Sequence, residues 1–573
     1  MKPAKKTPEI FLWPPPKRVE RTRGVQRIPR AGPKICACIR PHLAREAYEL
    51  EITTRYSSIV AGSALALAHA LQTLNQLYKH GGGTIPCARI VDAPDFPIRG
   101  FMLDISRGKV PTMAAFRALF DLLATLKFNH LQLYTEHTFA FRSHQKIWSD
   151  ASPLTAKEIG QLQALGRQRH IELSANFNSF GHFERWLKHP EYKHLAECPN
   201  GFVHPLKGRV LHGTTLRPNA ASLKFLDKLW AEYLPLFKSK RFNLGGDEPW
   251  ELGLGWSKPL VKKYGKHRVY LDFLKKLHQQ AAKHGKEILF WGDILLESPE
   301  LVKEVPKDAT ALLWGYEANH PFAEQCAKLA KAKRKFWVCP GTSAWNTFTG
   351  RTDNMLVNIE SAAKHGLANG AEGLLLTSWG DNGNHQPWPL MYPGLVYAAG
   401  MAWNAKGTKR TDLARAVNQV IFENRGVALA KCLIKAGQIE ATLNGGLHNA
   451  SRLHRWFFAP TTQVKSEAAK YSPKVLTGIE VKLAKLVGQL DKKAPAPGEN
   501  FYSRQELILG LRMAIWSVRR AQLIHAESGT LALKMGLRTL IEEFEKLWVL
   551  HTRARPGGLA ESVARMRAVE KEL

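Results

Sequence analysis

Cysteine is scarce in this chain and its spacing is irregular. Seven cysteines occur in 573 residues, an odd number without the spacing of a disulfide framework. Cys36 and Cys38 are one residue apart, but no second pair of metal ligands accompanies them. We therefore expect neither a disulfide-stapled fold nor a zinc site.

Long apolar runs are also missing. The richest apolar stretches are interrupted by charged residues or glycine before they reach membrane-spanning length. The start, Met1-Lys-Pro-Ala-Lys-Lys, is basic but is followed by no apolar segment with a small-residue cleavage site. We expect a cytoplasmic protein without a membrane partner.

Acidic residues are few, 49 against 82 lysines and arginines, which gives a net charge of +33. A basic excess can indicate a nucleic acid or acidic polysaccharide partner. However, the basic residues are spread along the whole chain, and only the first forty form a dense basic segment, rich in proline. We interpret the chain as generally basic, with nucleic-acid binding through that segment as the weaker alternative.

The length predicts several domains. Composition and periodicity divide the chain into four parts. Residues 1–40 are a Pro- and Lys/Arg-rich tail expected to be disordered, and residues 41–96 are a small α/β domain. Residues 97–408 alternate strands and helices, and residues 409–573 form a helical C-terminal domain. The helical domain carries no recognisable motif. We expect it to buttress the preceding region, with partner binding as the alternative.

The alternating region predicts the fold class. Eight apolar strand patterns, separated by helical patterns, fall at 99–106, 130–136, 171–177, 241–246, 287–291, 309–315, 336–340 and 373–379. Eight such units predict an α/β protein with a closed (β/α)8 TIM barrel, and a doubly wound open sheet is the alternative. In such barrels the chemistry lies at the C-terminal ends of the strands.

A carboxylate pair stands at that end of the fourth predicted strand. Gly245 and Gly246 permit a turn or a close approach, and Asp247 and Glu248 follow side by side. Adjacent carboxylates in a partly dry pocket cannot both ionise freely, so one can remain charged while the other holds a proton. The pair is a candidate for acid–base catalysis, and a solvated acidic loop is the alternative.

Other predicted strand ends carry further motifs. Arg99-Gly-Phe-Met-Leu-Asp104-Ile-Ser-Arg107 spans the first strand, Gly181-His182 follows the third, and Asn243-Leu-Gly-Gly-Asp-Glu248 ends the fourth. Aromatic residues and a carboxylate end strands five, six and eight: Trp291, Trp314, Trp379 and Asp381. Together these motifs resemble glycoside hydrolase family 20, the β-N-acetylhexosaminidases, over roughly residues 45–404.

The resemblance implies an exo-acting retaining hydrolase for terminal β-linked GlcNAc or GalNAc, with no metal or organic cofactor. In that family the substrate's own 2-acetamido group is the nucleophile. By resemblance, Asp247 would orient this group and stabilise its developing positive charge, and Glu248 would be the general acid and base.

The resemblance also implies the surrounding site. Arg99 would donate hydrogen bonds to sugar hydroxyls, and His182 would support Glu248 from behind. The three tryptophans would wall the acetamido group and the pyranose face, and Asp381 would accept from outer hydroxyls. We interpret Asp104 and Arg107 as structural.

Three positions depart from the family pattern. Asn243 replaces the signature's usual histidine. Glu136-His137 stand where many members of the family carry an aspartate that orients the histidine. Either Glu136 substitutes for it or His137 faces the substrate. The family's intermediate-stabilising tyrosine near strand seven is not evident, because Trp345-Asn346 occupy that region.

We therefore predict a β-N-acetylhexosaminidase acting on an N-acetylhexosamine-terminated glycan. Two alternatives remain: a barrel glycosidase specialised for acidic or modified glycans, which the basic charge would suit, and a carbohydrate-binding pseudoenzyme. The sequence gives no indication of the oligomeric state.

Overall fold

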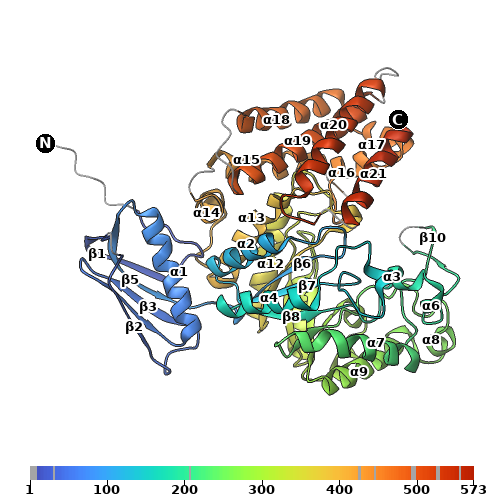
Figure 1. The fold of residues 1–573 in the computed structure, drawn as a ribbon, viewed down its shortest axis with the longest axis horizontal. Coiled ribbons are helices and arrows are strands. Elements are labelled where there is room, and N and C mark those ends of the chain that lie inside the picture. Colours follow the sequence, from blue (N-terminus) through green and yellow to red (C-terminus); the bar gives the residue numbers. More distant parts are fainter. Residues whose placement is uncertain are drawn as a thin grey trace.

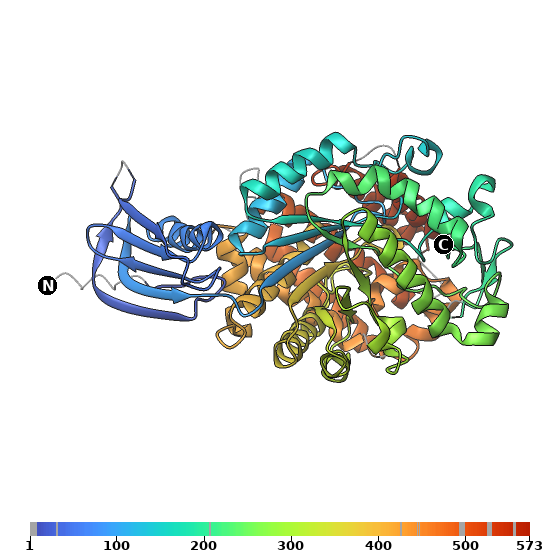
Figure 2. The ribbon, with the colours of Figure 1, turned by 90° about the horizontal axis from the view of Figure 1, so that it is seen from below.

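The computed structural model describes residues 9–29, 32–205, 208–423, 427–443, 445, 447–491, 499–523, 530–553 and 557–573. An N-terminal α/β domain, a closed barrel and a bundle of helices follow one another along the chain (Figure 1). The N-terminal domain projects from one end of the barrel, as the second view also shows (Figure 2). No helix among the described residues is long and apolar enough to cross a membrane.

The N-terminal domain is a five-stranded sheet covered on one face by a helix. The helix α1 (Ala64–His80) begins at Ser63, whose side chain accepts a hydrogen bond from the Ala66 N–H. It lies between the sheet and the rest of the molecule (Figure 1). The strands are ordered β1-β5-β3-β4-β2, with bounds Arg18–Arg27, Thr84–Asp92, Tyr48–Ile52, Ser57–Ala61 and Ile35–Ile39.

The expectation of a disordered tail over residues 1–40 is wrong for much of that segment. β1 pairs antiparallel with β5, and β2 pairs parallel with β4. Both added strands are almost wholly exposed, so they are held by backbone pairing at the sheet edges and not by an apolar pattern. That pairing joins residues far apart in sequence, and composition does not reveal it. Residues 1–8, 30 and 31 of the expected tail lie outside the described residues.

The barrel is closed, which excludes the doubly wound sheet. Its order is β11-β12-β13-β14-β15-β6-β7-β8, and parallel pairing of β15 with β6, from Gly373↔Ile98 to Ser378↔Leu103, completes the ring. Each of the eight strands lies within its predicted segment or begins one residue before it. In chain order, β6, β7, β8, β11, β12, β13, β14 and β15 span Ile98–Asp104, His130–Tyr134, Glu172–Asn176, Arg241–Asn243, Glu287–Trp291, Thr310–Trp314, Lys335–Cys339 and Gly373–Ser378.

Amphipathic helices surround the barrel. α4, for example, begins with a reciprocal capping box between Thr155 and Glu158 and buries Ile159, Leu162 and Leu165. The main barrel helices are α2, α4, α7, α9, α11, α12 and α13, with bounds Met113–Thr125, Ala156–Gln168, Ala220–Tyr233, Lys266–Lys283, Phe322–Lys331, Thr352–Ala368 and Tyr392–Trp403. α13 is buried along its whole length, because α12, the helical C-terminal domain and the N-terminal domain all pack against it.

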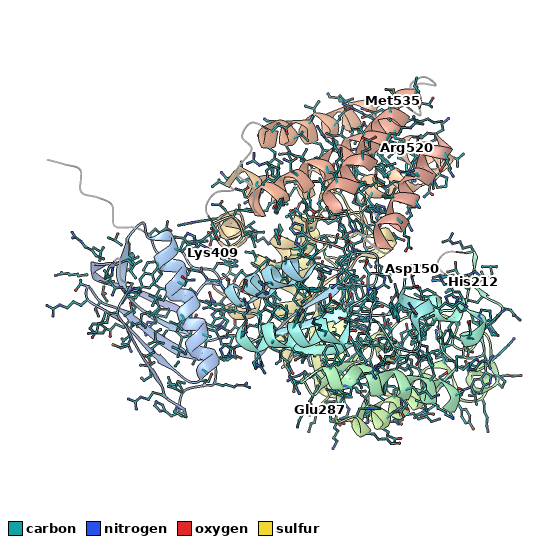
Figure 3. All side chains as sticks on the ribbon, in the orientation of Figure 1. Asp150, His212, Glu287, Lys409, Arg520 and Met535 are labelled. Carbon is teal, nitrogen blue, oxygen red and sulfur yellow. The ribbon has the colours of Figure 1, made fainter. Side chains whose placement is uncertain are left out.

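The C-terminal domain consists of helices, as predicted, and Lys409 lies where the chain passes into it from the barrel (Figure 3). Its α-helices, α14 to α21, span Leu413–Val420, Val427–Ile439, Arg452–Phe458, Thr461–Ala468, Pro473–Asp491, Glu499–Leu523, Thr530–Trp548 and Gly558–Glu572. Arg553 forms an ion pair with Glu158 of α4, and Ser562 contacts Gly383 just after β15. These contacts fix the domain against the barrel.

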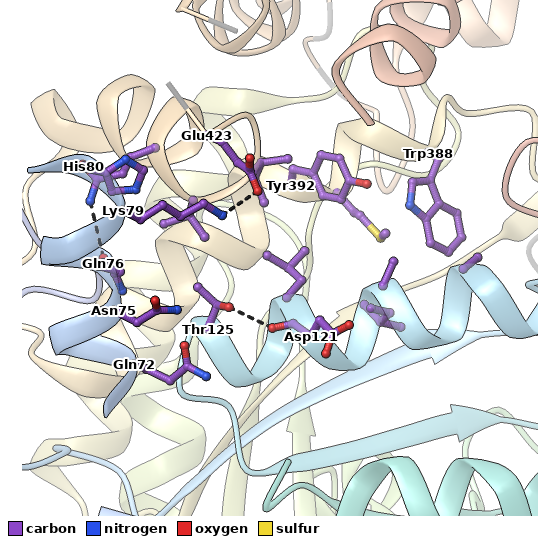
Figure 4. Close-up of a pocket in the computed structure, with 18 of the residues that line it drawn as sticks. Gln72, Asn75, Gln76, Lys79, His80, Asp121, Thr125, Trp388, Tyr392 and Glu423 are labelled. Atoms are coloured by element: carbon purple, nitrogen blue, oxygen red, sulfur yellow. Dashed lines mark hydrogen bonds and ion pairs between the residues drawn. The ribbon is translucent and has the colours of Figure 1, made fainter. Parts of the chain in front are cut away.

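A cleft of about 390 Å³ lies where the three parts meet. α1, α2 and the start of α13 line it, together with Trp388 and the Lys79–Glu423 ion pair (Figure 4). None of the predicted site residues lies in this cleft.

Candidate active site

The Asp247–Glu248 pair follows β11 in a turn that requires glycine. Gly245 and Gly246 have φ of 76° and 89°, in the left-handed region that disfavours other residues. A Cβ on Gly245 would lie 1.8 Å from Asn178 Oδ1, and one on Gly181 would lie 2.7 Å from the Asp247 carbonyl oxygen. The glycines therefore provide both the turn and the close approach that the sequence predicts.

The two carboxylates occupy different environments although they are neighbours. The Asp247 side chain is 10% exposed and the Glu248 side chain 36%. Glu248 itself has a φ of 47°, an uncommon conformation for a residue with a side chain and one often found at functional sites. Asp247 Oδ2 lies 3.1 Å from His182 Nε2, whereas Asp247 Oδ1 is buried without a hydrogen-bond partner among the described residues.

His182 lies between the carboxylates and carries a positive charge. Burial by itself would lower the pKa of His182, but Asp247 and Glu136 outweigh it and raise the pKa to about 10. The imidazolium is 3.7 Å from Glu136 and 3.8 Å from Glu248. The sequence predicts that His182 supports Glu248. In the structure, His182 lies closer to Asp247 than to Glu248.

Burial and the nearby Asp247 raise the pKa of Glu248, against the opposing effect of His182. Glu248 therefore retains a proton to higher pH than an ordinary glutamate. The pair therefore suits a division of roles. Asp247 is a buried carboxylate held by the His182 cation, and Glu248 is a more accessible group that can donate a proton.

Glu136, and not His137, lies behind His182. The Glu136 carboxylate accepts hydrogen bonds from the Tyr134 hydroxyl at 2.7 Å and pairs with Arg107 at 2.8 Å. His137 is buried, does not line the pocket, and has an unpartnered Nδ1 among the described residues. Of the two alternatives drawn from the sequence, the geometry fits the one in which Glu136 substitutes for the orienting aspartate.

Asn243 is completely buried beneath the pair. Its Oδ1 accepts the Gly245 N–H and its Nδ2 donates to Gln132, both at 3.0 Å. Asn243 therefore fixes the glycine turn.

Aromatic side chains form the pocket wall. The residues lining it are Arg107, His182, Asp247, Glu248, Trp291, Trp314, Tyr316, Trp379, Asp381 and Asn449. The Trp314 ring stacks on Tyr316, and Trp379 Nε1 donates to the Tyr316 hydroxyl at 2.8 Å. All three predicted tryptophans and Asp381 are thus brought together at the C-terminal ends of the strands.

Arg99 is not in this pocket, and its predicted role in binding the sugar is wrong. It is the second residue of β6 and so lies at the opposite end of the barrel from the carboxylates. Its guanidinium pairs with Glu46 of the N-terminal domain, donates to the Lys127 carbonyl at 2.8 Å, and lies over the Trp403 ring. Arg99 joins the two domains.

Arg107, which the sequence interpretation treated as structural, is the arginine that lines the pocket. It follows β6 at the C-terminal end, pairs with Glu136, and lies over the Trp379 ring at 5.5 Å. The rule that barrel chemistry lies at strand ends would have selected Arg107 over Arg99, because Arg99 begins the strand.

Three further residues near the carboxylates were missed. Tyr316 stands two residues after Trp314 and was detectable by its position at a strand end. Asp293 accepts from Trp314 Nε1 at 3.2 Å, and burial raises its pKa to about 7. Asn449 belongs to the helical domain, where no sequence signal indicated a site residue. No group of three or more His, Cys, Asp or Glu side chains in the described ranges is arranged to hold a metal ion.

Comparisons with known proteins identify the family and the fold. The family description "Glycosyl hydrolase family 20, catalytic domain" matches residues 96–365, and "Glycosyl hydrolase family 20, domain 2" matches residues 10–93. The second match includes β1 and β2, the strands in the segment expected to be disordered.

Curated relatives share a quarter of their aligned residues. The chain is 25% identical over 276 residues to the β-hexosaminidase subunit beta of Rattus norvegicus, covering 45% of this chain and 50% of that protein. It is 24% identical over 402 residues to the β-hexosaminidase subunit A1 of Dictyostelium discoideum, covering 64% and 71%. The chain thus spans about half the length of the rat relative.

Solved structures share the fold. A β-N-acetylhexosaminidase from Bacteroides fragilis is 16% identical with a TM-score of 0.59, covering 73% of this chain and 96% of that one. A chitobiase from Flavobacterium johnsoniae is 17% identical with a TM-score of 0.61, covering 97% and 99%. The two matching family descriptions together span more than half of the sequence, and the chain belongs to glycoside hydrolase family 20.

Proposed function

We propose that this protein is an exo-acting retaining β-N-acetylhexosaminidase that removes a terminal β-linked GlcNAc or GalNAc from a glycan. The observation that carries the proposal is the buried Oδ1 of Asp247, which has no hydrogen-bond partner among the described residues. A buried carboxylate oxygen without a donor is costly, and the N–H of a 2-acetamido group would supply that donor. Names of relatives from Rattus norvegicus and Dictyostelium discoideum, both β-hexosaminidase subunits, support the same activity.

The residues suit a reaction in which the substrate supplies the nucleophile. The acetamido carbonyl oxygen forms a bond to the anomeric carbon while the glycosidic bond breaks and Glu248 donates its proton to the leaving oxygen. Asp247 holds the acetamido N–H and stabilises the positive charge of the oxazolinium intermediate. Water then attacks the anomeric carbon, Glu248 takes its proton, and the intermediate opens to the free sugar.

The aromatic wall would enclose the acetamido group. Trp291, Trp314 and Trp379 offer apolar faces against the methyl group and the pyranose ring. Arg107 and Asp381 supply charged donors and acceptors for hydroxyls. Burial raises the pKa of Asp381 to about 6, against the effect of Arg107, so at neutral pH this carboxyl is predominantly an acceptor.

The test uses three nitrophenyl glycosides. We expect release of nitrophenol from the β-GlcNAc or β-GalNAc glycoside and none from the matched β-glucoside, which lacks the acetamido nucleophile. Asp247→Asn should lower kcat on the cleaved substrate by about 10²–10³-fold. Equal cleavage of the β-glucoside would refute the assisted mechanism. Sugar binding without cleavage of either N-acetylhexosaminide would instead favour the pseudoenzyme or a glycosidase for modified glycans.

Tyr316 is proposed to supply the hydroxyl that the family pattern places near strand seven. Trp345, which occupies that region, is buried and packs edge-on against the Tyr316 ring at 5.0 Å. Tyr316 therefore presents the phenol from the end of β13, where it can donate to the acetamido oxygen as that atom attacks.

Tyr316→Phe should lower kcat on the nitrophenyl N-acetylhexosaminide by about 10- to 100-fold with a smaller change in KM, because the hydroxyl acts on the reacting oxygen. The exposed Tyr264→Phe serves as the control for removing a phenol oxygen and should leave both constants unchanged. A rise in KM at constant kcat would mean that Tyr316 only orients Trp379.

A further inference from the structure

Among the described residues of the helical C-terminal domain, one lines the catalytic pocket. Asn449 lines the pocket together with Asp247, Trp314 and Tyr316. It precedes α16 and lies in the segment 447–451 of the helical domain. Its φ of 52° is in the left-handed region, which asparagine tolerates better than most residues.

The backbone of Asn449 is held by two loops of the barrel. Its N–H donates to Glu317 Oε1 at 2.7 Å, and Glu317, after β13, is in turn paired with Arg351. Its carbonyl accepts from Asn346 Nδ2, after β14, at 3.0 Å. The Ser451 N–H donates to the Asn346 carbonyl at 2.9 Å, so the segment is fixed on both sides of Asn449.

A third loop completes this arrangement. Asn382, which follows Asp381 after β15, donates to Asn346 Oδ1 at 3.0 Å. The segment 447–451 is therefore connected to the loops after β13, β14 and β15. In the closed barrel β15 lies four strands from β11, on the side opposite the carboxylate pair. A sugar with its anomeric carbon at Glu248 would extend its remote hydroxyls toward this side.

With its backbone groups occupied, Asn449 has only its side-chain amide to offer the pocket. This amide makes no hydrogen bond to another described residue, and the residue is half-buried. An amide presents both donors and an acceptor, which suits a hydroxyl group. The polar atoms of this amide are accessible from the pocket, so a hydroxyl of a bound ligand can pair with them directly.

We propose that the Asn449 side chain binds a hydroxyl of the terminal sugar away from the glycosidic bond, so that the helical domain forms part of the active site and contributes to sugar recognition. The inference rests on the proposed function for the identity of the sugar. It assigns to the helical domain a role in substrate binding beyond supporting the barrel.

The left-handed conformation of Asn449 allows side-chain and backbone effects to be separated. Asn449→Gly removes the amide and accepts the φ of 52° without strain, whereas Asn449→Ala removes the amide and adds strain. Asn449→Asp keeps the shape and the tolerance of this φ but replaces the donor with a carboxylate. His448→Ala, at the exposed neighbouring position, is the matched control.

We expect Asn449→Gly and Asn449→Ala both to raise KM for the nitrophenyl N-acetylhexosaminide about tenfold, the effect of one lost hydrogen bond to a ligand, with kcat within about twofold. The KM of Asn449→Asp should lie between that of these two variants and that of the wild type. The KM of His448→Ala should match the wild-type KM. A raised KM in Asn449→Ala but not in Asn449→Gly would show that Asn449 has a purely conformational role and would overturn the proposal. So would an unchanged KM in the glycine variant.

Binding of free N-acetylglucosamine, measured by calorimetry on the same proteins, separates this inference from the proposed function. Wild type that binds the sugar but cleaves neither N-acetylhexosaminide would contradict the enzyme activity alone, and weaker binding by Asn449→Gly would still support the Asn449 contact. Wild type that neither binds nor cleaves would overturn both. Wild type that cleaves, with Asn449→Gly unchanged in KM and binding, would overturn the Asn449 contact alone.

Discussion

Glu248→Gln should lower kcat on an unactivated N-acetylhexosamine disaccharide by about 10²–10⁴-fold, the usual contribution of a general acid. Glutamine keeps the shape of the side chain but has no acidic proton to give to the leaving oxygen. On the nitrophenyl glycoside the loss should be smaller, because nitrophenolate leaves without full protonation. The measurement is kcat on both substrates for the wild type and the variant.

The same variant tests the protonation state of Glu248. Since burial raises the pKa of Glu248, the wild-type kcat/KM should fall as pH rises through that pKa, at a higher pH than an ordinary glutamate would give. The alkaline fall should disappear in Glu248→Gln, which has no proton to lose. Glu300→Gln, at an exposed position, controls for the substitution itself. Equal losses on both substrates, with the alkaline fall retained, would assign the acid role to another group.

Arg99→Met should reduce the free energy of unfolding by about 3–5 kcal/mol, the typical result of removing one partner of a buried ion pair. Arg99 is 1% exposed, and its loss removes the cation paired with Glu46 and the guanidinium donor to the Phe96 and Lys127 carbonyls. Burial by itself would raise the pKa of Glu46, but His69 and Arg99 lower it to about 2, so Glu46 is charged in the wild type and loses its guanidinium partner in the variant. Denaturant unfolding followed by tryptophan fluorescence measures the change.

A surface pair in the N-terminal domain provides the matched control. Arg89 pairs with Glu49 with both side chains largely exposed, and Arg89→Met should cost less than about 1 kcal/mol. The Arg99→Met enzyme, assayed well below its unfolding midpoint, should keep the wild-type KM because Arg99 lies at the far end of the barrel from the pocket. A raised KM with unchanged stability would restore the sugar-binding role first predicted for Arg99.

The sequence alone was sufficient for the barrel and for much of the pocket. Strand periodicity located all eight barrel strands, since an apolar strand between amphipathic helices is a local pattern. Gly245, Gly246, Asp247 and Glu248 were recognisable because the turn and the carboxylates are contiguous in the chain. The tryptophans stand at predicted strand ends, which meet at one face of the barrel, and the resemblance to the family implied their place around the sugar.

Residues whose roles depend on contacts between distant segments were decided by the tertiary structure. Arg99 and Arg107 lie eight residues apart in one motif. Strand position alone places Arg107 at the catalytic end of β6, but only the packing of the N-terminal domain against the barrel shows that Arg99 pairs with Glu46. The β1 strand exists because β5 offers it an edge, which no property of its own sequence reveals. Asn449 reaches the pocket because two barrel loops, after β13 and β14, hold its backbone there. Local patterns determine which elements form, whereas long-range packing determines which side chains meet.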